Sequence, residues 1–140
     1  MRSSADRLTS ARLLLRVEDG AFASRLLGGP TPPGVRARVL GVLRQQRLLD
    51  AVLATACSRP LDRLDAEVRA ALRLGLFEGR CLGVPVPVAT DAAVRLVRRL
   101  GVPGAAGLVN AVLRRAAQGW GRTLAAAAPD LRHSHPAWLA

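Results

Sequence analysis

Apolar residues recur at steps of three and four along most of this chain, which is the spacing of one face of an α-helix. The stretch on which the rest is organised spans residues 61–82, where one such stripe is unbroken. Three acids fall in its first turns, where they can cap free N–H groups and oppose the helix dipole: Asp62, Asp65 and Glu67. The pattern therefore predicts a central helix that Gly83 stops.

Small residues within this stretch predict close helix packing. Ala71, Gly75 and Gly79 are spaced by four and share one face. Because Gly inside a helix costs about 1 kcal/mol relative to Ala, its presence there indicates that another helix crosses closely. We expect such a crossing at Gly75. For Gly79, a crossing and a frayed helix end both remain open.

The same apolar spacing predicts helices on both sides of the central one. Before it, we expect helices over residues 9–22 with a start as early as residue 4, over 21–27, over 35–46 and over 48–57. A short turn near residues 45–47 separates the last two, and the Gly- and Pro-rich run at 28–34 is a clear break. After it, we expect helices over 89–100 and 105–117. No alternating strand pattern occurs, so the expected fold class is all-α.

The composition agrees with an all-α fold. The chain has 140 residues, of which half are hydrophobic, so it can form one domain with a real core. Only 3% of the residues are aromatic, and the core must therefore be built from Leu, Val and Ala. Such a core suits helix packing and disfavours a β-sandwich, which depends on β-branched and aromatic residues.

The charge of the chain favours a polyanionic partner. The net charge is +11, and it comes from the two ends, because residues 1–60 and 92–140 each carry +6 whereas residues 61–91 carry −1. Nucleic acid is the default partner, and an acidic membrane surface is the other candidate. The sequence has no long apolar run and no signal-peptide pattern, so we expect a cytoplasmic protein without a membrane partner.

Cysteine and histidine side chains are the candidates for metal binding or nucleophilic chemistry. Cys57 and Cys81 have no C-x-x-C spacing and no nearby His. A disulfide, a metal ligand and a nucleophile are possible in principle, but the pattern favours two buried or half-buried free thiols. His133 and His135 have no cluster of acids or cysteines around them, which favours exposed linker residues over metal ligands. We expect no metal site.

Three motifs in this order resemble the NusB-type RNA-binding domain: LDRLDAEVRAALRLGLFE, VPVPVATDAAVRLVRRLG and GAAGLVNAVLRR. The resemblance covers roughly residues 8–118. It implies a compact NusB-like bundle of about six to seven helices in two subbundles, with residues 1–118 as the RNA-binding domain. The run LLGGPTPPGVRA departs from the family, because it is short and Pro-rich where the family has a longer second helix and loop. We therefore expect a shortened second helix.

Further motifs resemble one setting of this domain, the N-terminal part of the RsmB (Sun or Fmu) 16S ribosomal RNA cytosine-C5 methyltransferase. The runs VLGVLRQQRLLDAVL and SHPAWLA are similar to that version, and SHPAWLA resembles the start of the linker into the catalytic part. Residues 119–140 are accordingly expected to be a C-terminal extension. The resemblance implies a ribosomal RNA-binding domain, in a fragment or in a gene product that has lost its enzyme.

Two other functions remain open beside this one. The first is a free-standing NusB transcription antitermination factor, which would bind a boxA-like RNA together with a ribosomal protein. The second is a protein–protein interaction module whose arginine faces are only solvated. A methyltransferase domain encoded beyond residue 140 would favour the methyltransferase setting over the antitermination factor.

We expect no enzymatic activity from this chain. The methyltransferase family needs a glycine-rich loop for S-adenosylmethionine and a nucleophilic Cys, and neither cysteine here matches its motif. Residues 101–107 are glycine-rich, but they follow a helix rather than a strand, so they form a helix–helix turn. No cofactor is expected, and S-adenosylmethionine is expected only if a catalytic domain follows.

The RNA contacts are expected from arginines on the solvated faces of the terminal helices: Arg7, Arg12, Arg16, Arg95, Arg98, Arg99, Arg114 and Arg115. We expect the groups from the two ends of the chain to merge into one patch. Asn110 lies in the middle of a helix at the edge of its apolar stripe. A base contact is one interpretation, but the sequence favours a structural amide that caps loop backbone groups.

Overall fold

The structure, a computed structural model, describes residues 2–118, which form an all-α fold. The elements are α1 (Arg2–Glu18), α2 (Ala23–Leu26), α3 (Pro33–Ala56), the 3₁₀ turn η1 (Leu61–Arg63), α4 (Ala66–Cys81), α5 (Val86–Arg99), the 3₁₀ turn η2 (Pro103–Ala105) and α6 (Ala106–Gln118). No β-strand occurs between residues 2 and 118. Over the same residues, every helix is too short or too polar to cross a membrane.

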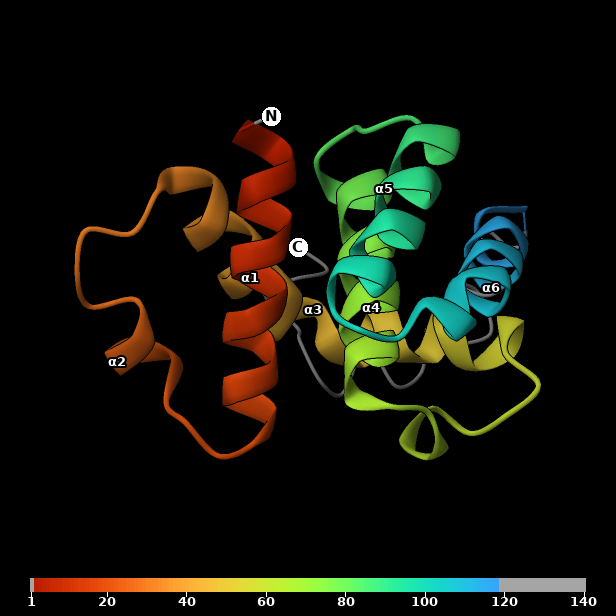
Figure 1. The fold of residues 1–140 in the computed structure, drawn as a ribbon, viewed down its shortest axis with the longest axis horizontal. Coiled ribbons are helices and arrows are strands. Elements are labelled where there is room, and N and C mark those ends of the chain that lie inside the picture. The colour runs from red at the N-terminus through yellow and green to blue at the C-terminus, as the bar shows by residue number, and fades with distance from the viewer. Residues whose placement is uncertain (1, 119–140) are drawn as a thin grey trace.

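Helix α4 occupies the centre of the fold (Figure 1). Helices α1 and α3 pack against it from one side, and α5 and α6 from the other, while α3 also reaches α6. The helices therefore form two groups, α1–α3–α4 and α4–α5–α6, which share α4. This arrangement confirms the predicted bundle of two parts, and its core is built from Leu, Val and Ala as the composition predicts.

Helix α3 is one continuous helix of 24 residues, so the predicted turn near residues 45–47 is wrong. The residues at that point, Gln45, Gln46 and Arg47, all favour helices, and no Gly or Pro interrupts the chain there. The buried stripe also continues through the position in steps of three and four, from Val42 to Leu49 and beyond. The long helix can therefore contact α1, α4 and α6 along its length.

The predicted helix over residues 61–82 is divided in two by the structure. The 3₁₀ turn η1 ends at Arg63, and Leu64 and Asp65 have extended backbone before α4 begins at Ala66. Asp65 occupies the N-cap position, although its side chain makes no capping hydrogen bond. The Arg69 guanidinium donates to the backbone carbonyls of Leu61 and Leu64 and so holds the turn against α4.

Glycines with positive φ end three of the helices. Gly83 follows α4 with φ +69° and Gly101 follows α5 with φ +88°, which agrees with the stops predicted at both positions. Gly20 has φ +111° and follows α1, so this helix ends at Glu18 and not at residue 22 as expected. Glycine suits these positions because other residues adopt a left-handed backbone at an energetic cost.

The segment between α1 and α3 contains only the single turn α2, which buries none of its four residues. This agrees with the shortened second helix expected from the Pro-rich run that follows it. The Arg36 guanidinium donates a hydrogen bond of 2.7 Å to the Leu27 carbonyl and ties the end of the segment to α3. Leu27 is itself buried and anchors the segment to the core.

Gly75 lies where α4 crosses α5 and α6. A Cβ atom at this position would lie 2.8 Å from the Leu113 Cδ1 atom and 3.2 Å from the Ala93 Cβ atom. Gly79, one turn later, has room, because its nearest neighbour would be the Val84 carbonyl at 3.8 Å. The close crossing expected at Gly75 is therefore present, and Gly79 has no such role.

Substitution of these two glycines tests the crossing. We expect Gly75→Leu to overpack the contact with α5 and α6 and to lower the free energy of unfolding by about 1–3 kcal/mol. Gly79→Leu is the matched control, and we expect it to leave stability unchanged or to raise it by up to about 1 kcal/mol through helix propensity. Urea unfolding of both variants measures the difference. Equal stabilities would contradict the packing described above.

Candidate nucleic-acid interface

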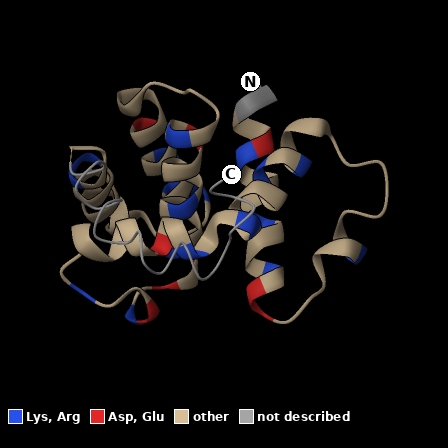
Figure 2. Cartoon of the chain, turned by 180° about the vertical axis from the view of Figure 1, so that it is seen from behind, with Lys and Arg blue, Asp and Glu red and all other residues tan. Residues whose placement is uncertain are grey.

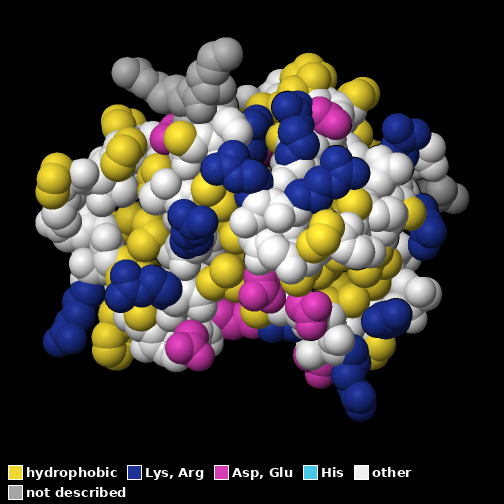
Figure 3. All heavy atoms as spheres, viewed as in Figure 1, with side chains coloured by type: hydrophobic (Ala, Val, Ile, Leu, Met, Phe, Trp, Pro, Cys, Tyr) yellow, Lys and Arg dark blue, Asp and Glu magenta, His cyan; other side chains and the backbone are white. Residues whose placement is uncertain are grey.

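A groove between α1 and α5 brings four arginines together. It has a volume of about 490 Å³ and is lined by Ser4, Arg7, Leu8, Ala92, Arg95, Leu96, Arg98 and Arg99. Figure 3 shows arginine side chains gathered on the face where α1 and α5 lie side by side. The described lining of this groove contains no acid, so the groove is a concentrated positive site.

The spacing of α5 explains why its arginines line the groove. Its apolar residues face the core, and Ala93, Leu96 and Val97 are buried there. Arg95, Arg98 and Arg99 fall on the opposite side and are exposed, so their guanidinium groups can reach a ligand. Arg95 is paired with Asp91 one turn earlier, but its side chain remains 70% exposed. An exposed pair of this kind is weak and can exchange partners.

Arg7 reaches the groove differently, because its guanidinium is tied to the core. Its Nε atom donates to both carboxylate oxygens of Glu78, at 2.7 and 2.9 Å. Glu78 is buried and also accepts a hydrogen bond of 2.7 Å from the Nε atom of Arg38. One carboxylate on α4 therefore holds an arginine from α1 and another from α3. Arg38 is buried, although it is charged, because of this pairing.

The other four arginines expected to bind RNA lie outside this groove. Arg12 and Arg16 are exposed on α1, and Arg114 and Arg115 are on α6. Helix α6 lies on the far side of α4 and α5 from α1 in Figure 1, and Figure 2 shows the same separation from behind. Arg115 donates a hydrogen bond of 2.9 Å to the Ala56 carbonyl at the end of α3. The expected single patch is therefore replaced by a groove at α1 and α5 and separate arginines on α6.

Asn110 has a side-chain partner on its own helix. Its Oδ1 atom accepts a hydrogen bond of 3.2 Å from the Nε atom of Arg114, one turn later on α6. Its expected role in capping loop backbone groups stays a prediction. The two side chains form a local pair on the surface of α6.

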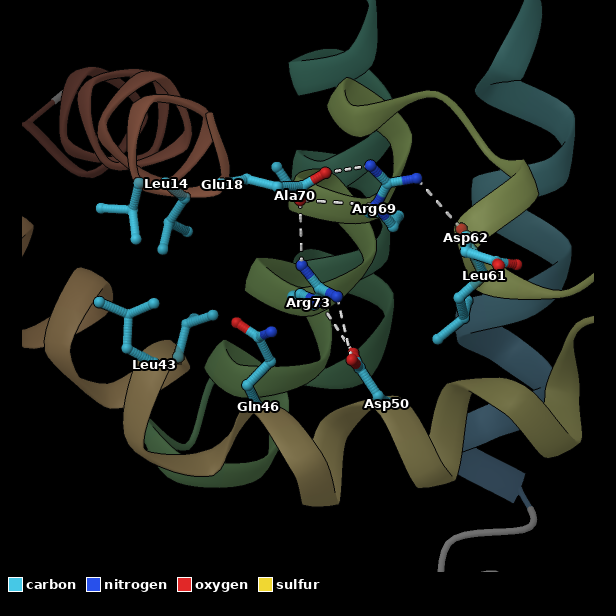
Figure 4. A pocket seen from close by; sticks show the side chains of 12 residues that line it. Leu14, Glu18, Leu43, Gln46, Asp50, Leu61, Asp62, Arg69, Ala70 and Arg73 are labelled. Atoms are coloured by element: carbon cyan, nitrogen blue, oxygen red, sulfur yellow. Dashed lines mark hydrogen bonds and ion pairs between the residues drawn. The ribbon is translucent and has the colours of Figure 1, made fainter. Parts of the chain in front are cut away.

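A second hollow of about 590 Å³ lies at the other end of α1, between α1, α3, α4 and η1 (Figure 4). Arg69 and Arg73, one turn apart on α4, both reach Glu18 at the end of α1. Arg73 also donates to both carboxylate oxygens of Asp50, at 2.8 and 2.9 Å. Ion pairs thus occupy this hollow, and its cations are already neutralised.

The sequence pattern did not identify this network. Glu18 is 51 residues from Arg69 and 55 residues from Arg73 along the chain. The only local signal is the four-residue spacing of Arg69 and Arg73, which places both on one helix face. The hydrogen bond from Arg69 lowers the pKa of the Glu18 carboxyl, with smaller contributions from the charges of Arg69 and Arg73 and opposition from burial.

The candidates for metal binding and nucleophilic chemistry can be checked in the part of the chain that the structure describes. No group of three His, Cys, Asp or Glu side chains there has the geometry to hold a metal ion. Cys57 is half-buried and Cys81 is exposed. Both are free thiols as the pattern favoured, but the expectation that both are buried or half-buried is wrong for Cys81. His133 and His135 lie outside the described residues.

The Glu18 pairs predict a loss of stability in acid. Because the folded-state pKa of Glu18 is lowered, its contribution is present above the unfolded pKa and is lost as the pH falls through the folded pKa. We expect Glu18→Gln to be less stable than the wild type near neutral pH, with a gap that closes as the pH falls from about 5 toward about 2. Urea unfolding across this range measures the gap, with Asp19→Asn as the control. A gap that is independent of pH would contradict the pairing.

Several known proteins are similar to this chain in sequence. The ribosomal RNA small subunit methyltransferase B of Xanthomonas campestris pv. campestris is 40% identical over 80% of this chain and 28% of its own length. The protein of the same name from Thermus thermophilus is 40% identical over 99% of this chain and 35% of its own length. The transcription antitermination protein NusB of Halorhodospira halophila is 40% identical over 57% of this chain and 52% of its own length. The chain thus spans about a third or less of the length of the two methyltransferases.

Two solved structures share the fold. A chain in the crystal structure of a plectonemic RNA supercoil has a TM-score of 0.73 at 22% identity, and the match covers 86% of this chain and 97% of that one. A chain in the structure of the antitermination factors NusB and NusE in complex with dsRNA has a TM-score of 0.69 at 22% identity, covering 83% and 96%. The match to the NusB family covers residues 4–118, which are nearly all the residues that the structure describes. The chain belongs to the NusB family.

Proposed function

We propose that this chain is a non-catalytic RNA-binding domain that holds RNA phosphates in the groove between α1 and α5. The observation that carries the proposal is the convergence of four arginines on that groove: Arg7, Arg95, Arg98 and Arg99. A guanidinium presents a planar fork of donors that matches the oxygens of a phosphate. The fold supports the proposal, because both matching structures contain RNA according to their descriptions.

We further propose that the RNA is ribosomal and that the domain serves a 16S ribosomal RNA cytosine-C5 methyltransferase. The support is the 40% identity to two proteins named ribosomal RNA small subunit methyltransferase B, one of which matches 99% of this chain. In such a protein, the domain would grip the substrate RNA while a covalently linked catalytic part carries out the reaction. A domain of this kind contributes affinity and orientation, and it needs no reactive side chain of its own.

The alternative is a transcription antitermination factor that binds RNA together with a ribosomal protein. It is favoured by the 40% identity to the NusB protein of Halorhodospira halophila and by the matching structure in which NusB accompanies NusE and dsRNA. The match to that NusB protein covers 57% of this chain, against 99% for the Thermus methyltransferase, so the first function has the broader support. Both functions use an RNA-binding groove.

We propose no S-adenosylmethionine site among the described residues. A glycine-rich cradle of the usual kind follows a β-strand, and residues 2–118 contain no strand. The glycine-rich turn after α5 joins two helices instead, through Gly101 and the 3₁₀ turn η2. We therefore assign methyl transfer to no residue of this domain.

Salt dependence tests the RNA-binding groove. Each phosphate that an arginine neutralises releases counterions, so four contacts on single-stranded RNA give a slope of log K against log salt of about −3. We expect the triple variant Arg95→Gln, Arg98→Gln, Arg99→Gln to reduce the magnitude of that slope by about two units. Fluorescence anisotropy of a labelled RNA, titrated at several salt concentrations, measures both slopes.

The matched control removes the same charge elsewhere. Arg25, Arg44 and Arg63 are exposed on α2, α3 and η1, away from the groove lining. The triple variant with Gln at these positions should keep most of the wild-type slope, because its arginines do not contact the phosphates. If the control and the groove variant lose slope equally, binding depends on net charge alone. If the wild type does not bind RNA at low salt, the protein-interaction function takes precedence.

Incubation with labelled S-adenosylmethionine and ribosomal RNA tests the non-catalytic assignment. We expect background incorporation from this chain, because the proposal assigns the reaction to a covalently linked catalytic part and not to this domain. A catalytically active RsmB-type methyltransferase is the positive control for the RNA substrate. Saturable methylation at cytosine C5 by this chain would overturn the assignment.

A further inference from the structure

We propose that the buried carboxylate of Glu78 is a positioning group that presents Arg7 to a phosphate in the α1–α5 groove. The inference rests on the proposed function and adds a specific contact to it. Among the arginines that line the groove, Arg7 has a fixed orientation, whereas Arg95 has only an exposed partner and Arg98 and Arg99 have no ion-pair partner among residues 2–118.

The hydrogen bonds divide the Arg7 guanidinium into two edges. The Nε atom is directed to the core, where it donates to the two Glu78 oxygens at 2.7 and 2.9 Å. Within residues 2–118, the two Nη groups make no hydrogen bond, and the side chain lines the groove while only 15% exposed. One edge is therefore anchored, and the donors of the other edge are available to a ligand oxygen.

Arg38 satisfies the rest of the buried charge. Its Nε atom donates to Glu78 Oε2 at 2.7 Å, and its Nη1 atom donates to the Gly34 carbonyl at 3.0 Å. Asp6 lies 4.0 Å from the same Nη1 atom. The Arg38 side chain is 9% exposed and does not line the groove. Arg38 thus binds the Glu78 carboxylate from the core side, while Arg7 binds it from the side of the groove.

This geometry favours phosphate binding for an entropic reason. A free surface arginine loses rotamer freedom when it binds, and this loss reduces affinity. Arg7 has already lost that freedom in the unbound protein, so it binds at a smaller entropic cost. Lysine is a poor replacement, because its ammonium is a compact point charge and lacks the planar fork that presents one edge to a carboxylate and another to a phosphate.

The comparison of Arg7→Lys with Arg38→Lys tests the proposal. Both variants keep the net charge and both change one partner of Glu78, so a purely structural role would affect them alike. We expect Arg7→Lys to weaken binding of a single-stranded RNA oligonucleotide about tenfold at fixed salt, through the loss of one charge-assisted contact. Arg38→Lys should bind within about twofold of the wild type at temperatures where circular dichroism shows it folded. Wild-type affinity in Arg7→Lys, or an equal loss in both variants, would overturn the proposal.

A double-mutant cycle with Glu78→Gln identifies the carboxylate as the positioning group. In the Glu78→Gln background, Arg7 is no longer held, so Arg7→Lys should cost no further affinity. A full tenfold cost in that background would show that Glu78 does not position Arg7. If Glu78→Gln does not fold, the comparison of the two lysine variants decides.

The groove variants separate this inference from the function on which it rests. If the triple Gln variant of Arg95, Arg98 and Arg99 loses affinity while Arg7→Lys does not, the groove binds RNA and only the role of Glu78 is wrong. If the wild type itself fails to bind RNA at low salt, both proposals fall.

Discussion

The interaction on which the structure depends is the buried carboxylate of Glu78, shared by Arg7 and Arg38. It joins α1 and α3 to α4 at a point where only 1% of the Glu78 side chain is exposed. A buried charge that loses its partner costs about 3–5 kcal/mol, so α1 and α3 must pack in the positions that supply both guanidinium groups. Apolar side chains of similar volume often stabilise a fold as well as a buried ion pair, so we infer that the site contributes more to the specificity of packing than to net stability.

The same carboxylate connects the core to the surface. Arg7 donates through its Nε atom to the buried Glu78 carboxylate, and its side chain also lines the α1–α5 groove. The opposite end of α1 is different, since Arg69 and Arg73 there are occupied by Glu18 and Asp50. Pairing thus occupies the arginines at one end of the molecule, whereas in the groove Arg98 and Arg99 have no ion-pair partner among residues 2–118 and Arg7 keeps its Nη groups free of hydrogen bonds. The distribution of free guanidinium groups, rather than the net charge of +11, defines the proposed RNA site.

Local spacing predicted the parts of the fold that local chemistry determines. Helices α5 and α6, the stops at Gly83 and Gly101 and the close approach at Gly75 all follow from apolar periodicity and glycine geometry. The extended link before α4 and the unbroken α3 were missed. The extended link precedes α4 because Asp65 occupies the N-cap position of that helix. Helix α3 is unbroken because no residue near positions 45–47 would interrupt a helix.

The candidate site was only partly predictable for a similar reason. The outward arginines of α5 follow from the helical period of that element alone. The pairing of Arg7 with Glu78 joins residues 71 positions apart, and nothing in the local pattern distinguishes Arg7 from Arg12 or Arg16. The separation of α6 from α1 depends on how the helices pack around α4, so the merging of the two arginine groups could not be judged from the sequence.

Nitrogen-15 spectra of the arginine Nε–H groups, recorded while a single-stranded RNA is added, test the central claim most directly. We expect the resonances of Arg7, Arg95, Arg98 and Arg99 to shift together and to saturate at one affinity, while those of Arg114 on α6 change little. Shifts confined to the α6 arginine, with the groove resonances unchanged, would contradict the account.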